Sequence, residues 1–399
     1  MNILICTTSP FPTGTAGSVR TKTIAKLFKN NGHEVFVLSL FPNNEPSVKK
    51  EIAYKDYDGI KYRLLKTLNY PIFFTKRYSF LSYVSIFNSL LFARETVESI
   101  FINENIELVL FYSWSAIEIE PIVRIAKKHG IKTIADVVEW PNKDYFKWGY
   151  LNPLFWNTKR LLKHTYFCVD GVISISTYIK KQYETSKKTM VIPAIIDTSS
   201  YEKGYVNKNN NDHEFVISYL GSLFPKDDPL IIIYILNELL EKGYKVKVNI
   251  IGNIQKNKTS NRFHFLVKHY NISNVINFLG RLPDDILDDF LHTSDILLLP
   301  RQNHIGVVAS FPTRIPELLM IGKPLVTSDV GDVILYLNDG EHAVIGKPGD
   351  YIDISKKIIS LFNNIELREA MGNQGKSQAK KIFNYNHYSV ALENFLRDL

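Results

Sequence analysis

The chain has 399 residues, of which 45% are hydrophobic and 22% are charged, and its formal net charge is +8. One hydrophobic core rarely grows past about 250–300 residues, so the length predicts two domains. The composition is ordinary for a globular protein and excludes a wholly disordered chain. Cys6 and Cys168 are the two cysteines, too few for a disulfide framework and without metal-ligand spacing, which indicates a reducing compartment.

Apolar runs and basic residues bear on targeting and on partners. The apolar run from Met1 to Cys6 is too short for a signal peptide, and no stretch of about 18 apolar residues predicts a transmembrane helix. Basic pairs such as Lys127-Lys128 and Lys187-Lys188 fit solvated helix faces, an anionic membrane surface or phosphate-bearing ligands. Nucleic acid is not expected, because none of its usual binding motifs is present.

The first domain begins with a strand, a glycine-rich turn, a helix and a second strand. We expect the strand at 3–6, the turn at 9–18, the helix at 18–31 and the next strand at 34–40. This order is a βαβ unit of a parallel sheet. The same pattern recurs with strands at 107–112, 131–138 and 171–176 and a helix at 118–130.

A polar, low-complexity run near 190–213 interrupts this series and predicts an interdomain linker. After it the alternation restarts, with strands expected at 215–220, 245–251, 274–279, 295–299 and 324–327 and helices at 230–242, 283–292 and 314–321. An α/β barrel would need eight evenly spaced units, and the linker breaks that spacing. The predicted fold class is therefore α/β, with two doubly wound Rossmann-like domains facing a cleft.

Ligands of open α/β sheets bind at the carboxyl ends of the strands, so the βα turns and the interdomain cleft are where function is expected. The first candidate turn holds Gly14 and Gly17, followed by Arg20 on the next helix. Glycines let the backbone approach a ligand, and a helix N-terminus attracts anions. An ordinary tight turn with an extended arginine is the alternative. The spacing is not GxGxxG, so a dinucleotide motif is not supported.

The second candidate is the start of the helix expected at 314–321. Thr313 suits an N-cap, and Pro316 is tolerated only in a first turn. Arg314 adds a positive fork for a diphosphate, and Glu317 has a carboxylate able to accept two ribose hydroxyls. The alternative is that Glu317 only complements the helix dipole.

Two further turns carry charged groups. Gly221, Ser222 and Lys226 follow the first strand of the second domain and could flank the same diphosphate, unless Lys226 is an ordinary surface lysine. Asp136 and Glu139 follow a strand of the first domain; one of them could orient or deprotonate an acceptor hydroxyl, unless the acid only caps the next helix. The histidines show no metal-ligand spacing, so no metal site is predicted.

Aromatic and basic residues alternate between Tyr70 and Phe101. Such a mixture suits an interfacial segment touching lipid, but a core helix is the favoured interpretation. The first reading places the protein at an anionic membrane surface.

Three stretches together resemble glycosyltransferase family 4. Residues 9–17 with 31–35 look like the family's N-terminal glycine loop and GHEV turn, and 191–197 looks like its interdomain IPNGVD stretch. The stretch from 294 to 350 is the most specific match. The form Pro312-Thr313-Arg314-x-x-Glu317 is similar to the PSKxxEY subgroup. Two departures stand out: Ala309 takes the place of a donor-motif glutamate, and Ser222 the place of an arginine.

The resemblance implies a GT-B enzyme, in which residues 1–190 bind the acceptor, 191–382 bind the nucleotide sugar, and a helix at 383–399 crosses back to the first domain. It implies a retaining, hexosyltransferase-type reaction from a nucleotide-diphosphate sugar, UDP- or GDP-linked, to a hydroxyl of a glycan or lipid-linked glycan, in capsule or lipopolysaccharide synthesis. No cofactor or metal is expected, because positive groups would neutralise the leaving diphosphate.

The same resemblance assigns roles to the candidate residues. The donor would be bound by Gly14, Gly17, Gly221, Ser222, Lys226, Thr313, Arg314 and Glu317, and catalysis would involve Arg20, Asp136 and Glu139. A cytoplasmic location, peripheral at the inner membrane face, is expected. Three other functions stay open: a GT-B sugar-nucleotide epimerase or hydrolase, a non-catalytic nucleotide-sugar-binding protein, and a membrane scaffold.

Overall fold

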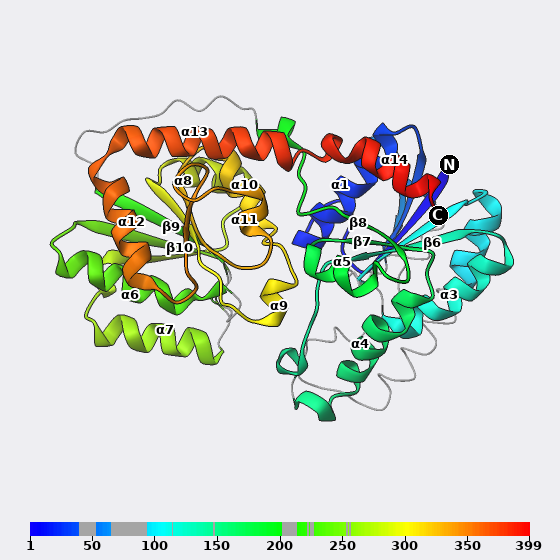
Figure 1. Ribbon diagram of the computed structural model, residues 1–399, viewed down its shortest axis with the longest axis horizontal. Coiled ribbons are helices and arrows are strands. Elements are labelled where there is room, and N and C mark those ends of the chain that lie inside the picture. Colours follow the sequence, from blue (N-terminus) through cyan, green and yellow to red (C-terminus); the bar gives the residue numbers. More distant parts are fainter. Residues whose placement is uncertain are drawn as a thin grey trace. The chain divides into compact units, whose positions relative to one another are not determined.

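The structure is a computed structural model (Figure 1) that forms two compact units, described separately here. Unit 1 comprises Met1–Ile196 and Tyr385–Leu399, and unit 2 comprises Asp197–Asn384. For comparison, the sequence placed its boundaries after residues 190 and 382. The structure describes residues 1–39, 53–64, 94–113, 115–146, 148–201, 214–221, 223, 227–252, 254 and 257–399.

Unit 1 is built on an eight-stranded sheet in the order β3-β4-β2-β1-β5-β6-β7-β8. All neighbouring strands are parallel except β3 and β4, which are antiparallel. Its strands are β1 (Asn2–Thr7), β2 (Glu34–Ser39), β3 (Lys55–Tyr57), β4 (Ile60–Leu64), β5 (Leu108–Tyr112), β6 (Lys132–Val137), β7 (Gly171–Ser174) and β8 (Lys188–Val191). Strands β1 and β5 are apolar and buried, as expected for parallel strands covered on both faces.

Helices connect these strands, and their ends follow local capping chemistry. The helices are α1 (Ala16–Asn30), α3 (Ala116–Lys128), α4 (Pro153–Lys163), α5 (Thr177–Tyr183) and α14 (Ser389–Arg397), and residues 94–103 are also helical. Helix α1 begins with a capping box between Thr15 and Ser18, and its C-cap is Asn31, followed by Gly32 at φ +82°. The predicted turn at Asn31-Gly32 is therefore confirmed.

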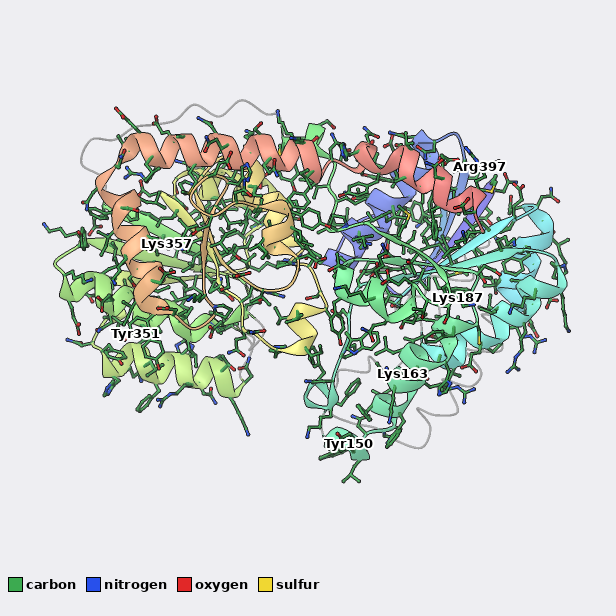
Figure 2. All side chains as sticks on the ribbon, viewed as in Figure 1. Tyr150, Lys163, Lys187, Tyr351, Lys357 and Arg397 are labelled. Atoms are coloured by element: carbon green, nitrogen blue, oxygen red, sulfur yellow. The ribbon has the colours of Figure 1, made fainter. Side chains whose placement is uncertain are left out.

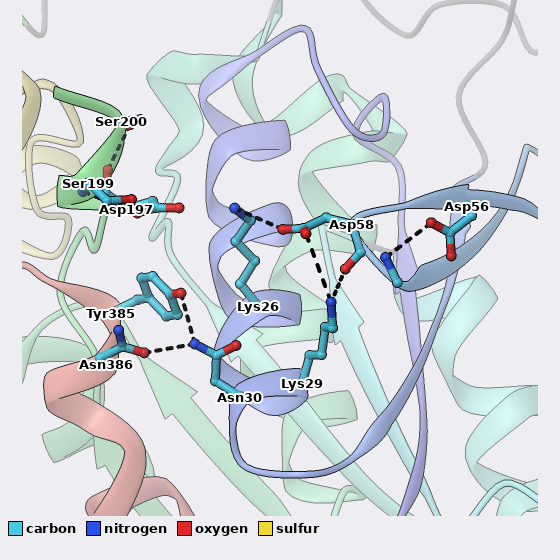
Figure 3. A network of polar contacts seen from close by, with 11 residues as sticks. Lys26, Lys29, Asn30, Asp56, Asp58, Asp197, Ser199, Ser200, Tyr385 and Asn386 are labelled. Carbon is cyan, nitrogen blue, oxygen red and sulfur yellow. Dashed lines mark hydrogen bonds and ion pairs between the residues drawn. The ribbon is translucent and has the colours of Figure 1, made fainter. Parts of the chain in front are cut away.

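The C-terminal segment Tyr385–Leu399 belongs to unit 1. Leu392 and Phe395 of α14 belong to the same core cluster as the strands of the large sheet. Glu393 accepts hydrogen bonds from Asn31 Nδ2 and pairs with His33 Nε2, each at 2.8 Å. In Figure 3, Asn30 likewise reaches the C-terminal segment through Tyr385 Oη at 2.9 Å.

An ion pair ties α1 to the edge of the same sheet. Figure 3 shows Lys26 and Lys29 of α1 facing Asp58, which lies in the turn between β3 and β4; the Lys26 Nζ to Asp58 Oδ2 distance is 3.2 Å. The antiparallel pair β3–β4 is a feature that the alternating pattern does not predict, because short, charged edge strands carry little apolar signal.

Unit 2 has a six-stranded, all-parallel sheet in the order β11-β10-β9-β12-β13-β14. Its strands are β9 (Phe215–Leu220), β10 (Val246–Ile251), β11 (Ile276–Gly280), β12 (Ile296–Leu299), β13 (Leu325–Ser328) and β14 (Val344–Gly346). Its helices are α6 (Pro229–Glu241), α7 (Lys258–His269), α8 (Asp284–His292), α9 (Ile305–Val308), α10 (Arg314–Met320), α11 (Val333–Tyr336), α12 (Tyr351–Asn363) and α13 (Ile365–Ile382).

Strand order in both sheets reverses next to the first strand of the unit. In unit 1, β1 lies between β2 and β5, and in unit 2, β9 lies between β10 and β12. This is the doubly wound arrangement predicted from the sequence, and it makes the carboxyl ends of β1 and β9 the ligand-binding edges. The two α/β sheets confirm the predicted fold class.

Candidate functional site

The turn after β1 and the start of α1 hold two glycines, Gly14 and Gly17, at positions that exclude a side chain. Gly14 has φ +142°, a backbone conformation that other residues rarely adopt. A Cβ on Gly17 would clash with Ser9 Oγ and would lie 3.2 Å from the Tyr112 ring. Both glycines are therefore required by the local geometry, and no bound group is needed to explain them.

Arg20 is buried and bound by other groups of unit 1. Its side chain is 3% exposed, and its Nε and Nη2 each donate to a carboxylate oxygen of Asp136 at 2.8 Å. Nη1 donates to the carbonyl of Pro193 at 2.7 Å, and Nη2 to that of Ile192 at 3.0 Å. Burial alone would lower the pKa of Arg20, but Asp136 outweighs burial and raises it. The pair joins α1, β6 and the segment after β8.

Asp136 therefore has both carboxylate oxygens occupied and is 2% exposed. Two buried phenols lie in its field: burial raises the pKa of Tyr112 and of Tyr166, and the negative charge of Asp136 raises both further. This part of unit 1 is a neutralised, closed network. A water or a substrate hydroxyl has little access to Asp136.

Glu139, three residues further along, is exposed. The neighbouring Trp140 packs edge-on against Tyr178 and Tyr183, with ring centroids 6.0 and 6.3 Å away, and Lys163 Nζ lies 5.4 Å from its ring. Of the two acids predicted at the end of β6, only Glu139 is exposed to approach by an acceptor.

In unit 2, Arg314 and Glu317 lie in the first turns of α10, between β12 and β13. Arg314 Nη1 lies 3.2 Å from Glu317 Oε2, and the side chains are 47% and 21% exposed. The predicted cap is wrong in one respect: Thr313 has helical backbone angles and makes no side-chain cap hydrogen bond. The helical backbone geometry therefore already includes Thr313, one turn before Pro316.

A second arginine, Arg301, lies at this edge and was not among the candidate residues predicted from the sequence. Arg301 follows β12 after a single proline; its Nη1 pairs with Asp227, and its backbone N–H donates to Ser328 Oγ at 2.9 Å. The Arg301 side chain is 7% exposed, and its Nε has no hydrogen-bond partner among the described residues. Burial raises the pKa of Asp228, the residue after Asp227, and outweighs a hydrogen bond from Gln302 that lowers this pKa. The sequence signal that could have identified Arg301 is a charged residue that follows an apolar strand after a single proline.

The Gly221 turn is described only in part. Gly221 follows β9, and a Cβ there would clash with the Tyr219 hydroxyl, so a glycine is required. Ser222 and Lys226 lie outside the described residues. Ala309, at the end of α9, is fully buried, so the site of the replaced glutamate is packed with core atoms.

The aromatic segment at 70–101 also lies largely outside the described part. Its described end is helical and buries Phe101, whose ring lies 6.5 Å from that of His129. Within the described ranges, no helix is long and apolar enough to cross a membrane. Over the same ranges, no group of three or more His, Cys, Asp or Glu residues is placed to hold a metal ion.

Sequence comparison finds similarity to known proteins mainly within unit 2. Residues 203–378 match the family model of "Glycosyl transferases group 1". An uncharacterized glycosyltransferase of Methanocaldococcus jannaschii is 29% identical over 53% of this chain and 55% of its own length. A capsular polysaccharide biosynthesis glycosyltransferase, CapM of Staphylococcus aureus, is 26% identical over 54% and 58%. The matched region thus spans little more than half the length of these relatives.

Structural comparison covers the whole chain. The structure of Anabaena HepE in complex with UDP and glucose has a TM-score of 0.72 at 14% identity, with full coverage of both chains. The chain has the GT-B fold. Sucrose-phosphate synthase from Thermosynechococcus elongatus (TM-score 0.74, 13% identity, 100% and 98% coverage) and the lipopolysaccharide outer core galactosyltransferase WaaB (0.65, 15%, 100% and 99%) share it. The GT-B prediction is confirmed, whereas the PSKxxEY subgroup stays a prediction.

Proposed function

We propose that the protein is a retaining glycosyltransferase that moves a sugar from a nucleotide-diphosphate sugar to a hydroxyl of a glycan or lipid-linked glycan acceptor. The match of residues 203–378 to the group 1 family carries this proposal. The complex of HepE with UDP-glucose and the naming of CapM for capsular polysaccharide synthesis support the donor class and the surface-glycan pathway. A cytoplasmic reaction is part of the same proposal.

Unit 2 is assigned the donor. Glu317 accepts hydrogen bonds from the ribose hydroxyls. The proposed diphosphate-binding residues are Thr313, Arg314, Gly221, Ser222 and Lys226. Arg301 joins this set, because a buried cation at the end of β12, whose Nε has no hydrogen-bond partner among the described residues, can stabilise negative charge on the leaving diphosphate.

Unit 1 is assigned the acceptor. Glu139 is exposed and orients or deprotonates the acceptor hydroxyl, whereas the Arg20–Asp136 pair positions the end of β6 that carries it. Gly14 and Gly17, at which the turn after β1 excludes a side chain, are kept as proposed donor-binding residues. Charge neutralisation by side chains also leads us to propose transfer without a metal.

Thermal unfolding with UDP, GDP, ADP, CMP and their sugar conjugates tests the donor assignment. Ligand binding to the native state stabilises it by RT ln(1 + [L]/Kd), about 2.7 kcal/mol at roughly 100 times Kd. A single responding nucleotide names the base. No response from any nucleotide contradicts donor binding and favours the scaffold alternative.

Turnover assays separate the remaining alternatives. A transferase consumes the donor only when an acceptor is present. Consumption without acceptor indicates an epimerase or hydrolase, and tight binding without consumption under any acceptor indicates a binding protein. Product anomer analysis by NMR then decides between retention and inversion.

A further inference from the structure

Three aromatic rings of unit 2 meet at the loop that leads into α10. Phe311 belongs to this loop, Tyr336 ends α11, and Phe383 follows the last residue of α13. The ring centroids of Phe311 and Tyr336 are 5.4 Å apart, those of Phe311 and Phe383 5.5 Å, and those of Tyr336 and Phe383 5.7 Å. We call these three residues the ring cluster. At such distances each pair of rings adds stabilisation beyond the burial of its area.

The ring cluster is buried, and two of its members have bonded backbones. Phe311 and Phe383 are 2% and 0% exposed, and Tyr336 is half-buried. Gln378 Nε2 donates to the Tyr336 carbonyl at 2.7 Å, and the Phe383 N–H donates to the Ala379 carbonyl at 2.9 Å. Burial raises the pKa of Tyr336 to about 12, so its phenol is neutral at ordinary pH. Phe311 and Phe383 are therefore out of reach of a ligand.

The same loop is also contacted by the turn before α11. Gly331 has φ +61°, and a Cβ there would lie 2.8 Å from the Val308 carbonyl oxygen and 3.4 Å from that of Ser310. Ala309, between those two residues, is fully buried. Residues 308–311 are therefore contacted by Gly331 in their first part and by the ring cluster at their end.

Helix α10 itself does not need the rings for its packing. It buries Ile315, Leu318 and Leu319 and packs against α13, as the side chains in Figure 2 show. The body of the helix is thus anchored by its own apolar face. What the ring cluster adds is a fixed position for the loop residue Phe311, two residues before Thr313.

The first turns of α10 carry Arg314 and Glu317, to which the proposed function assigns the donor. Binding is stronger when the residues of a site are already in place, because they need not be ordered by the ligand. We propose that Tyr336 and Phe383 are positioning residues of the donor site, which hold the loop at Phe311 and through it the start of α10 in the donor-binding geometry. This inference rests on the proposed function, and neither ring needs to touch the donor.

Nucleotide affinity and hydrogen exchange of variants that lack a ring test this positioning. Phe383→Leu and Tyr336→Leu each remove a ring but keep an apolar side chain. Calorimetric titration uses UDP first, since UDP is bound in a HepE structure, and then GDP, ADP and CMP. We expect the Kd to rise about tenfold in each variant, with faster exchange of the backbone amides of residues 308–317. Tyr336→Phe keeps the ring and should bind like the wild type.

The matched control is Phe263→Leu in α7. Phe263 is likewise fully buried in unit 2, and its ring centroid lies 6.1 Å from that of Phe278, outside the ring cluster. It should lose about as much stability as F383L but keep the Kd and the exchange rates of residues 308–317. Equal weakening of binding in F263L, an unchanged Kd in F383L and Y336L, or faster exchange without weaker binding overturns the proposal.

Failure of this inference is distinguishable from failure of the proposed function. If the wild type binds none of the four nucleotides, the donor assignment is wrong and the positioning role is wrong with it. If the wild type and all variants bind one nucleotide equally, only the positioning role is wrong. Circular dichroism and thermal melts establish that each variant is folded at the titration temperature. Should F383L be unfolded, Y336L carries the test, because its site is only half-buried.

Discussion

The two units carry arginine–carboxylate pairs of opposite character at their candidate edges. In unit 1, Arg20 and Asp136 are 3% and 1% exposed, and the guanidinium makes four hydrogen bonds within the unit. In unit 2, Arg314 and Glu317 are 47% and 21% exposed and share one 3.2 Å contact. Arg20 thus uses four of its five N–H donors within the protein.

This difference separates two uses of the same residue types. A fully bonded buried pair fixes the backbone around it, and removal of one partner leaves an uncompensated charge. An exposed pair is worth little to stability. We therefore propose that Arg20 and Asp136 position the backbone and that Glu317 binds the donor. The first two of the four measurements below test this division.

The largest effect is expected from Asp136→Ala. It leaves the Arg20 charge buried without a partner, which should cost about 3–5 kcal/mol of unfolding free energy in urea or thermal unfolding. Arg160→Ala, which breaks the exposed bidentate pair with Glu120, is the control and should cost less than about 1 kcal/mol. Equal costs for the two variants would remove the distinction between the pairs.

Glu317→Ala should leave stability nearly unchanged but weaken the donor. Hydrogen bonds to a charged group contribute about 1.5–3 kcal/mol, so kcat/KM for the donor should fall roughly 10- to 150-fold. The control is Glu238→Ala, which breaks another helical pair, with Lys242, at a similar 22% exposure. A normal kcat/KM in E317A, or an equal loss in E238A, contradicts ribose binding by Glu317.

Gly17→Ala tests whether the turn after β1 is packed as tightly as the Arg20 network beside it. The added methyl meets Ser9 and the Tyr112 ring, and overpacking of this kind costs about 1–3 kcal/mol. Gly32 has open space around it, but its φ of +82° makes it a poor control. Thermal unfolding of Gly17→Ser in parallel should show a larger loss, and unchanged melting of both variants would contradict the tight packing.

The smallest effect concerns pH in unit 2. Burial, and then the charge of Lys323 and Lys376, lowers the pKa of His292 from 6.5 to about 4. The unfolded chain therefore binds the extra proton between those values, and the native state loses stability as pH falls from 6.5 towards 4. His292→Gln should flatten the fall in melting temperature over this window. An identical pH profile in both proteins would show that His292 is not shielded.

Strand positions were predictable because parallel strands buried on both faces read as short apolar runs. The run at 215–220 matches β9 residue for residue, and those at 3–6 and 107–112 differ from β1 and β5 by a residue or two at their ends. The short, charged strands β3 and β4 carry no such run, so the hydrophobic pattern did not predict their pairing.

The α/β strand pattern, the glycine turns and the family 4 resemblance could be predicted, since they depend on local periodicity and on residues close in the chain. Which charged residues are paired and buried could not be predicted, because it depends on contacts between distant segments. Asp136 and Glu139 are neighbours in sequence, yet one is enclosed by Arg20, 116 positions away, and the other is exposed. Arg301 meets Asp227 across 74 positions. Burial and pairing arise from packing between distant segments, which local sequence does not encode.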